Sequence, residues 1–254
     1  MPKLSVIITT RDEEANIRAC IDSVGWADEI IVVDDDSRDR TREIAAGYPN
    51  VRVVRRAMAQ GFGRQKQFAL QQASGEWVLS LDADERVSEE LRQEIIAAIS
   101  RSRCAGFRLR RRNFVLDRFL LDRGVRNIRL FKRSSAFFSP VRVHESVVLN
   151  GRCGAMRSPL LHFANSSRTI EGMTRAANTY STLSAQDLFE RGRRLTPVTM
   201  PLYACAYPLY LFFWQYILEG RFLDGRAGFA VSFFRALEGF LISVKLWELQ
   251  RRRR

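Results

Sequence analysis

Residues 4–36 decide the fold class, and their sequence is LSVIITTRDEEANIRACIDSVGWADEIIVVDDD. The stretch begins with an almost wholly apolar, β-branched run (4–10), which is typical of a strand buried on both faces of a parallel sheet. Four apolar residues then recur at the spacing i, i+3, i+4, i+7, which places one apolar stripe along a helix. They are Ile17, Cys20, Ile21 and Val24. A second apolar run (30–33) stops at three consecutive aspartates.

The same alternation of strand and helix continues to residue 99. Further strands are predicted over 51–54 and 76–81, and helices over 39–46, 63–73 and 88–99. Repeated strand–helix units are typical of an α/β fold with a Rossmann-like, mostly parallel sheet that is flanked by helices. After residue 105 the pattern changes, because two stretches alternate apolar and basic residues and predict strands of a smaller mixed sheet. These stretches are 107–114 and 126–132.

The net charge indicates which partners the chain can bind. With 41 basic and 28 acidic residues the net charge is +13, which favours nucleotide diphosphates, phosphorylated glycans, anionic lipid or nucleic acid. Aromatic residues are sparse among the arginines of 108–133 and no nucleic-acid motif occurs, so nucleic acid is the less favoured partner. The four cysteines form no C-x-x-C pair, so neither a zinc site nor a disulfide framework is expected. Because the first strand pattern begins at once, we also expect no secretory signal peptide.

Asp82-Ala-Asp84 follows directly after the predicted strand and is the most informative motif. Two carboxylates at i and i+2 beyond a buried strand are costly unless a cation lies beside them. A hard divalent ion, Mn²⁺ or Mg²⁺, that shares its oxygen ligands with substrate phosphates is the natural occupant. An isolated D-x-D is more often a solvated turn, but the buried strand and a second acidic cluster favour the metal.

The second acidic cluster, Asp34 to Asp36, ends another predicted strand. In nucleotide-binding α/β sheets an acid at this point accepts hydrogen bonds from a ribose or a base, although Ser37 and Asp39 could also simply cap the next helix. Ligands of such sheets lie beyond the carboxyl ends of the strands, so we expect three strand ends to converge on one crevice. They are 9–11, 34–36 and 82–84. Lys66 could pair with a nucleotide there or be a solvated helix residue.

The two histidines, His144 and His162, both lie in the second half of the chain. Glu145 could act as the general base for an acceptor hydroxyl, and His144 could orient it or bind metal. A lone residue of either type is more often structural, and the adjacent pair is what favours a role in the site. His162 lies in an apolar stretch and is predicted to be a core residue or to support the site from behind.

Taken together, three motifs resemble the inverting family-two glycosyltransferases, which have a GT-A fold. They are Leu4–Thr10 followed by Asp12-Glu13-Glu14, Ile31–Asp34 with Ser37, Asp39 and Thr41, and Gly75–Asp84. Later motifs are similar to one branch, which contains lipopolysaccharide core glucosyltransferases that act on an inner-core heptose. They are Arg129-Leu-Phe131, Val143-His-Glu145, Phe222–Gly225 with Gly228-Phe, and Lys245-Leu-Trp-Glu.

The resemblance implies roles for individual residues. The positions that match nucleotide-sugar contacts are Thr9, Arg11, Glu13, Asp34 or Asp35, Lys66 and Asp82, and the metal motif is Asp82 and Asp84 with the second acid nearest the ion. Three departures from the family concern the donor contacts. Asp35-Asp36 stands where the branch has Ser-Gly, Asp12 replaces Asn, and Lys66-Gln67 replaces Arg-Asn.

The resemblance also implies how the chain is organised. We expect a glycosyltransferase domain over 1–190, with a nucleotide-sugar-binding half (1–104) and an acceptor-binding half (105–190), followed by a C-terminal amphipathic helical region (191–254). The expected reaction moves a sugar, such as glucose, from a UDP-sugar to a lipid-linked glycan. A sugar nucleotidyltransferase is disfavoured, because it needs a glycine-rich basic loop after the first strand, where this chain is acidic.

The segment 195–218 contains no charged residue and has seven aromatic side chains, but three prolines interrupt this segment. We favour two interfacial or re-entrant helices whose arginines face anionic lipid, at the cytoplasmic face of a bacterial inner membrane. A membrane span and a buried helical hairpin are the alternatives.

Overall fold

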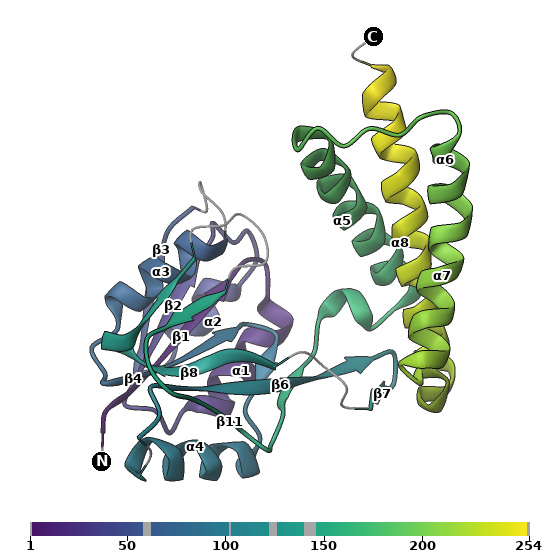
Figure 1. Cartoon of the computed structure of the whole chain (residues 1–254). Coiled ribbons are helices and arrows are strands. Elements are labelled where there is room, and N and C mark those ends of the chain that lie inside the picture. Colours follow the sequence, from purple (N-terminus) through teal and green to yellow (C-terminus); the bar gives the residue numbers. More distant parts are fainter. Residues whose placement is uncertain (1, 58–61, 102, 122–125, 140–145, 253–254) are drawn as a thin grey trace. The chain divides into compact units, whose positions relative to one another are not determined.

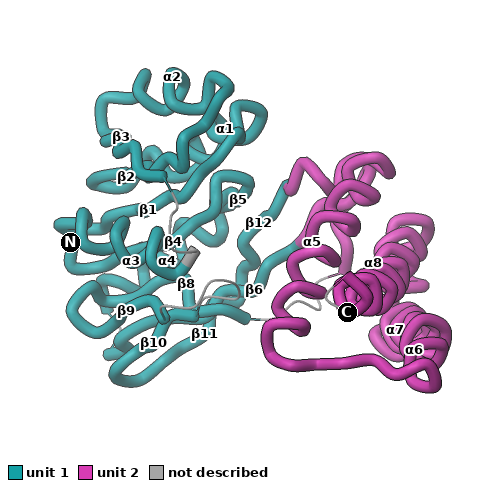
Figure 2. Tube along the Cα trace, turned by 90° about the horizontal axis from the view of Figure 1, so that it is seen from above, with its two compact units in different colours: residues 1–112, 124–163 teal, residues 113–123, 164–254 magenta. Residues whose placement is uncertain are grey.

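The structure, a computed structural model, divides the chain into two compact units (Figure 2). The described residues are 2–57, 62–101, 103–121, 126–139 and 146–252. Unit 1 comprises residues 1–112 and 124–163, and unit 2 comprises residues 113–123 and 164–254. Each unit has its own clusters of buried apolar side chains, as expected of separate packing bodies.

Unit 1 begins with the predicted alternation of strands and helices (Figure 1). The parallel strands are β1 (Leu4–Thr10), β2 (Glu29–Asp34), β3 (Val51–Arg55) and β4 (Trp77–Asp82). The helices are α1 (Glu14–Val24), α2 (Thr41–Ala46), α3 (Phe62–Gln72) and α4 (Glu89–Arg101). Each predicted element is present, because each carries the apolar spacing of its own secondary structure.

The rest of unit 1 extends this sheet with further strands. They include β5 (Glu85–Arg86), β6 (Gly106–Val115), β8 (Arg126–Lys132), β11 (Cys153–Ala155) and β12 (Leu160–His162). The strand order is β3-β2-β1-β4-β8-β6-β12-β5, where β8 is antiparallel to both β4 and β6, and β11 is parallel to β6. A separate two-stranded sheet pairs β9 (Ala136–Phe138) with β10 (Val147–Leu149). The α/β fold with a mostly parallel sheet is therefore confirmed.

The two faces of the sheet are covered by different helices. Successive residues of a strand point to opposite faces, so Val6 of β1 packs among side chains of α1, α2 and α4, whereas Ile7 packs against α3. Both side chains are almost completely buried. Helices on both faces explain why the central strands are apolar throughout rather than alternating. Because both faces of the sheet are covered, polar side chains lie at the edge where these strands end.

Unit 2 is mainly helical. Its elements include β7 (Arg118–Phe119), α5 (Ile170–Glu190), α6 (Thr199–Pro201), α7 (Tyr207–Phe213) and α8 (Gly225–Arg251). π-Helical stretches, Leu202–Ala206 and Trp214–Leu218, follow α6 and α7. The expectation that three prolines interrupt this segment is therefore wrong for two of them. The chain stays helical past Pro201 and Pro208, where the changes of pitch accommodate the missing backbone donors.

The units do not divide at residue 190, where the sequence analysis placed the end of the first domain. The division falls between 163 and 164, because α5 packs along α8 within unit 2. Lys245 of α8 contributes to this packing. Its ammonium nitrogen donates to Asn178, Ser181 and Thr182 of α5 at 2.6–2.8 Å.

The side chains of α8 do not follow the amphipathic pattern that was expected of the tail. Most of its buried residues are small, and its exposed ones include large aromatic side chains. The buried residues are Ala227, Gly228, Ser232, Gly239, Ser243 and Leu246, and the exposed aromatics are Phe229, Phe233, Phe240 and Trp247. Among the described residues one helix, Arg221–Arg251, is long and apolar enough to cross a membrane, although a core helix of a soluble protein can pass the same test.

A buried ion pair fixes the turn that precedes α8. Arg221 and Asp224 lie 3.1 Å apart, and both also bond the backbone of Leu121, which donates its N–H to Asp224 at 2.6 Å. Gly228 lies directly against this turn, because a Cβ at this position would lie 1.9 Å from the carbonyl oxygen of Arg221. The motif Phe222–Gly225 with Gly228 therefore has a structural explanation.

Candidate active site

The carboxyl ends of β1, β2 and β4 meet at one edge of the sheet in unit 1. Their register pairs Thr10 with Asp34 and Thr9 with Asp82, so the two acidic clusters flank the end of β1. The structure thus brings together the three strand ends that the sequence predicted to converge. This follows from parallel pairing, since neighbouring parallel strands end on the same side of the sheet.

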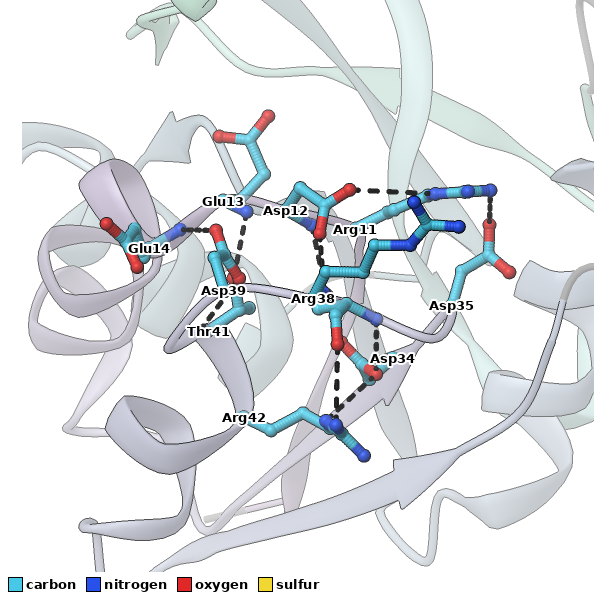
Figure 3. Close-up of polar contacts among 11 residues, drawn as sticks. Arg11, Asp12, Glu13, Glu14, Asp34, Asp35, Arg38, Asp39, Thr41 and Arg42 are labelled. Carbon is cyan, nitrogen blue, oxygen red and sulfur yellow. Dashed lines mark hydrogen bonds and ion pairs between the residues drawn. The ribbon is translucent and has the colours of Figure 1, made fainter.

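The loops after β1 and β2 are joined to each other by hydrogen bonds (Figure 3). Asp12, which has a positive φ of 52°, donates its N–H to Ser37 at 3.0 Å and accepts from the N–H of Arg38 at 2.7 Å. Glu13 donates its N–H to Thr41 at 2.8 Å. Much of the acidic sequence between Asp12 and Asp39 therefore serves to fix these two loops.

The structure distinguishes Asp34 from Asp35, which the sequence could not. Asp34 is fully buried and accepts bonds from the N–H and the hydroxyl of Ser37, while Arg42 lies 3.6 Å away. Asp35 instead pairs at 3.1 Å with Arg11, whose side chain is 56% exposed (Figure 3). Asp34 therefore holds the turn, and Asp35 with Arg11 forms the more accessible pair of the predicted nucleotide contacts.

Asp82 lies between two cations that come from different elements. The nitrogen of Lys66 in α3 is 2.8 Å from one carboxylate oxygen, and Arg129 of β8 is 3.0 Å from the other. Burial acts to raise the pKa of Asp82, but the charges of Lys66 and Arg129 outweigh it and hold that pKa well below its usual range. The alternative that Lys66 is a solvated helix residue is wrong, because its side chain is only 5% exposed.

Glu85 completes this cluster and was not predicted. Its side chain is fully buried, it accepts the N–H of Asp82 at 2.9 Å, and it pairs with Arg129 at 2.9 Å. Burial raises the pKa of Glu85 above its ordinary value, against the opposing charge of Arg129. Arg129 thus bridges two carboxylates and fixes the start of the turn that carries the D-x-D motif.

Asp84 pairs with His162, which the sequence analysis placed in the core or behind the site. The Nε2 atom of His162 lies 3.2 Å from a carboxylate oxygen of Asp84, and both side chains are less than a fifth exposed. Pairing of β12 with β5 brings them together, since His162 lies opposite Glu85. The position of His162 at the D-x-D motif depends on a strand pairing that no local pattern in the sequence reveals.

The D-x-D motif and His162 bring a few possible metal-ligand atoms together at this point. Among the described residues no group of three His, Cys, Asp or Glu side chains could hold a metal ion. Asp84 and His162 offer one oxygen and one nitrogen ligand, whereas Asp82 is already paired with two cations. Mg²⁺ and Mn²⁺ often take few protein ligands and complete their coordination with substrate phosphates and water. Such sharing is compatible with these residues.

Cys20 of α1 lies beneath the same turn. Its thiol is completely buried and lies 3.7 Å from the carbonyl oxygen of Asp82. Burial raises the pKa of Cys20 well above its usual value, and the nearby Glu85 adds to the effect. His144 and Glu145, the predicted catalytic pair, lie outside the described residues.

The fold and this acidic strand-end site define a glycosyltransferase with a GT-A-like fold. Residues 5–158 match the family described as "Glycosyl transferase family 2", and the chain belongs to that family. The lipopolysaccharide core biosynthesis glycosyltransferase LpsC of Rhizobium meliloti is 33% identical over 98% of this chain and 94% of its own length. An uncharacterized glycosyltransferase of Rickettsia bellii is 30% identical over 97% of this chain and 87% of its own length.

Solved structures confirm the fold. S. aureus TarS 1-349 in complex with UDP is 17% identical, with a TM-score of 0.52 over 99% of this chain and 92% of that protein. The Pyrobaculum calidifontis mannosyltransferase PcManGT in complex with GDP-Man and Mn²⁺ is 15% identical, with a TM-score of 0.53 over 96% of this chain and 87% of that protein. The prediction of a GT-A fold is confirmed.

Proposed function

We propose that this chain is a metal-dependent, inverting glycosyltransferase that moves a sugar, glucose in the first instance, from a UDP-sugar to a lipid-linked glycan such as lipopolysaccharide inner core. The observation that supports this most is the convergence of Asp35, Asp82 and Asp84 at one edge of the sheet. The names of the relatives support the class of acceptor, because LpsC acts in lipopolysaccharide core biosynthesis.

The donor is assigned from the residues at the ends of β1 and β2. Thr9, Arg11, Glu13 and Asp35 match positions that contact the nucleoside in the family, and Asp34 supports their loop from below. One structural neighbour is in complex with UDP and another with GDP-Man. The similarity of fold alone therefore does not select the nucleobase of the donor. UDP is proposed on the motif resemblance.

In the proposed mechanism an acceptor hydroxyl oxygen attacks the anomeric carbon in a single displacement. The carboxylate of Glu145 takes the hydroxyl proton as the new bond forms, and UDP leaves with the electrons of the broken bond. Asp84 and His162 would hold Mn²⁺ or Mg²⁺, which as a Lewis acid neutralises charge that develops on the diphosphate. Lys66 and Arg129 hold the Asp82 carboxylate in position beside the reacting centre.

Unit 2 is proposed to contact the membrane at the cytoplasmic face. Packing through small residues with large apolar side chains outward is usual for helices in lipid, where water provides no drive to bury aromatic rings. α8 has this arrangement, with Gly228 and Gly239 buried and Phe229 and Phe233 exposed. The arginines at the end of the chain would lie near anionic headgroups.

Calorimetry with the whole chain tests the donor assignment. We expect UDP with Mn²⁺ to bind more tightly than GDP or CMP, and chelation of the metal to weaken UDP binding. Equal affinities for the three nucleotides would contradict the roles of Arg11 and Asp35.

The role of Glu145 as the general base is tested separately with the variant Glu145→Gln. The amide keeps the shape of the side chain but cannot accept a proton, so turnover should fall by about 10²–10⁴-fold while UDP affinity is unchanged. Normal turnover in this variant would exclude Glu145 as the base.

A further inference from the structure

A cavity of about 220 Å³ lies in unit 1 among residues of α3, β4, β6, β8, β9 and β10. Its lining includes Lys66, Ser80, Arg108, Arg126, Arg129 and Phe138. Four of these side chains are cationic, and none of the described residues that line the cavity is acidic. The cavity is smaller than the roughly 300–1,000 Å³ pockets that hold drug-sized ligands, so it suits one small anionic group rather than a nucleotide.

The charges of this cavity are only partly balanced within the protein. Lys66 and Arg129 are paired with Asp82, but Arg108 and Arg126 form no ion pair with any described residue. Arg126 also lies directly opposite Arg110 in the pairing of β6 with β8, an arrangement that repels. The rim therefore carries an excess of positive charge that an anion would neutralise.

A buried hydroxyl provides a second, independent observation. Ser80 of β4 is only 1% exposed, and its hydroxyl has no hydrogen-bond partner among the described residues. A buried hydroxyl without a partner costs free energy, so such groups normally have a partner or receive one from a ligand. Ser80 lines the cavity, where a bound oxyanion could accept its proton.

The strand order separates the cavity residues of β6 and β8 from the proposed nucleotide contacts at the ends of β1 and β2, while Lys66 of α3 lines the cavity and is also one of the predicted nucleotide-sugar contacts. The order is β3-β2-β1-β4-β8-β6, so the nucleotide contacts on β1 and β2 lie on one side of β4 and the cavity residues of β8 and β6 lie on the other. Asp82 at the end of β4 touches Lys66 and Arg129, which both line the cavity. The cavity therefore adjoins Asp82, and its residues of β6 and β8 lie beyond β4 from the strand ends of β1 and β2.

We propose that this cavity binds an anionic substituent, a phosphate or a carboxylate, of the acceptor sugar, so that the enzyme selects an acidic acceptor. The inference rests on the proposed function for the identity of the second substrate. Arg108 and Arg126 supply guanidinium groups that bind either oxyanion, and Ser80 donates its hydroxyl proton. Asp82 keeps Lys66 and Arg129 at a fixed distance from the bound anion.

Calorimetry at about 0.15 M salt, where exposed charges are largely screened, tests this with three probes: mannose 6-phosphate, glucuronate and mannose. The titrations are made on the whole chain with and without saturating UDP and Mg²⁺. At least one acidic sugar should bind about tenfold more tightly than mannose, and Arg108→Gln with Arg126→Gln should remove that difference. Preference for mannose 6-phosphate indicates a phosphate acceptor, and preference for glucuronate indicates a carboxylate.

Two variants separate ligand binding from structural or general charge effects. Ser80→Ala should weaken the acidic probe and leave the melting temperature equal or higher, since its hydroxyl has no partner inside the protein. Arg101→Gln with Arg103→Gln removes the same charge from exposed positions outside the cavity and should bind the probes like the wild type.

Three results would overturn the inference: acidic sugars that bind no better than mannose, an acidic sugar that displaces UDP, or an equal loss in the Arg101 and Arg103 control. A failure of UDP itself to bind contradicts the proposed donor instead. The titrations without UDP still test the cavity in that case.

Discussion

Unit 1 and unit 2 distribute their side chains in opposite ways. In unit 1 large apolar residues such as Ile7 and Trp77 are inside, and charged residues gather at one edge of the sheet. In unit 2 the interior of α8 is mostly small residues, and large aromatic residues such as Phe229 and Phe233 are exposed. The first arrangement is usual for proteins in water, whereas the second is usual for helices in lipid.

Buried charges also differ between the units. The cluster of Asp82, Lys66 and Arg129 lies at the site and is partly open to solvent, whereas Arg221 and Asp224 are enclosed and bond only within unit 2 among the described residues. A charge cluster at the carboxyl edge of a sheet can act on a ligand. An enclosed pair beside a turn can only fix the backbone. The comparison supports the proposal that unit 1 carries the chemistry and unit 2 the membrane contact. Each of the following changes tests one part of that proposal.

The largest effect is expected from Asp84→Ala in unit 1. Loss of the carboxylate removes the proposed metal ligand, and turnover should fall by about 10²–10³-fold or more, as when one electrostatic contact to a transition state is removed. The variant should still fold, although its melting temperature should fall somewhat, because the change removes the pair of Asp84 with His162. Transfer assays with Mn²⁺ and Mg²⁺ measure the loss. Full activity in the folded variant, or in excess chelator, would show that Asp84 has no such role.

Deletion of Arg251–Arg254 tests the attachment role of unit 2. Each basic residue near an anionic membrane contributes about 1 kcal/mol, so loss of four arginines should weaken binding to anionic vesicles by up to about 10³-fold at low salt. Some binding should remain at high salt, because burial of aromatic area is not screened. Four lysines in place of the arginines should restore most of the binding. Complete release of the intact chain by salt would contradict the proposed contact of the aromatic side chains with lipid.

Gly228→Ala should destabilise unit 2 and spare the site. The added Cβ would lie 1.9 Å from the carbonyl oxygen of Arg221, and overpacking of this kind costs about 1–3 kcal/mol. Thermal unfolding and amide exchange of α8 measure the effect, and UDP affinity should not change. Gly25→Ala is the matched control, because a Cβ there meets its nearest atoms at 3.7 Å. A variant as stable as the wild type would contradict this close packing of α8 on the turn.

The smallest effect concerns pH and Glu29 in unit 1. Burial opposes ionisation of Glu29, but hydrogen bonds from Ser5 and Ser74 lower its pKa from 4.5 to about 2. Since the folded pKa is the lower one, the stabilisation is complete above pH 4.5 and is lost as pH falls towards 2. In the variant Glu29→Gln, the free energy of unfolding should no longer fall over this pH range. Near neutral pH it should be lower than that of the wild type by about 1 kcal/mol. Parallel acid-unfolding curves for the two proteins would argue against it.

The fold of the first hundred residues could be predicted because the information is local. Each strand and helix there carries its own apolar spacing, and the residues at the strand ends are consecutive in sequence. The packing of α5 in unit 2 could not be predicted, since its partner, α8, begins far along the chain at Gly225. The buried face of α8 could not be predicted from hydropathy, because small residues are buried there while large aromatic residues are exposed.

The site could be predicted only as far as parallel strands determine it. Alignment of the strand ends followed from the sequence, but the partners of the acids did not. Arg129 and Asp82 are 47 residues apart and meet through the antiparallel pairing of β8 with β4. His162 reaches Asp84 through the pairing of β12 with β5. Charge pairs of this kind depend on register, which no periodicity in a single segment reports.

Cys20 makes the turn after β4 open to observation without any labelled substrate. Its thiol is enclosed beside the carbonyl of Asp82, and burial keeps its pKa high, so a thiol reagent can reach it only when α1 and β4 separate. Cys205, on unit 2, is exposed and serves as the fast-reacting reference in the same molecule. The rate at which Cys20 reacts, relative to that of Cys205, therefore reports how often the layer beneath the D-x-D motif opens.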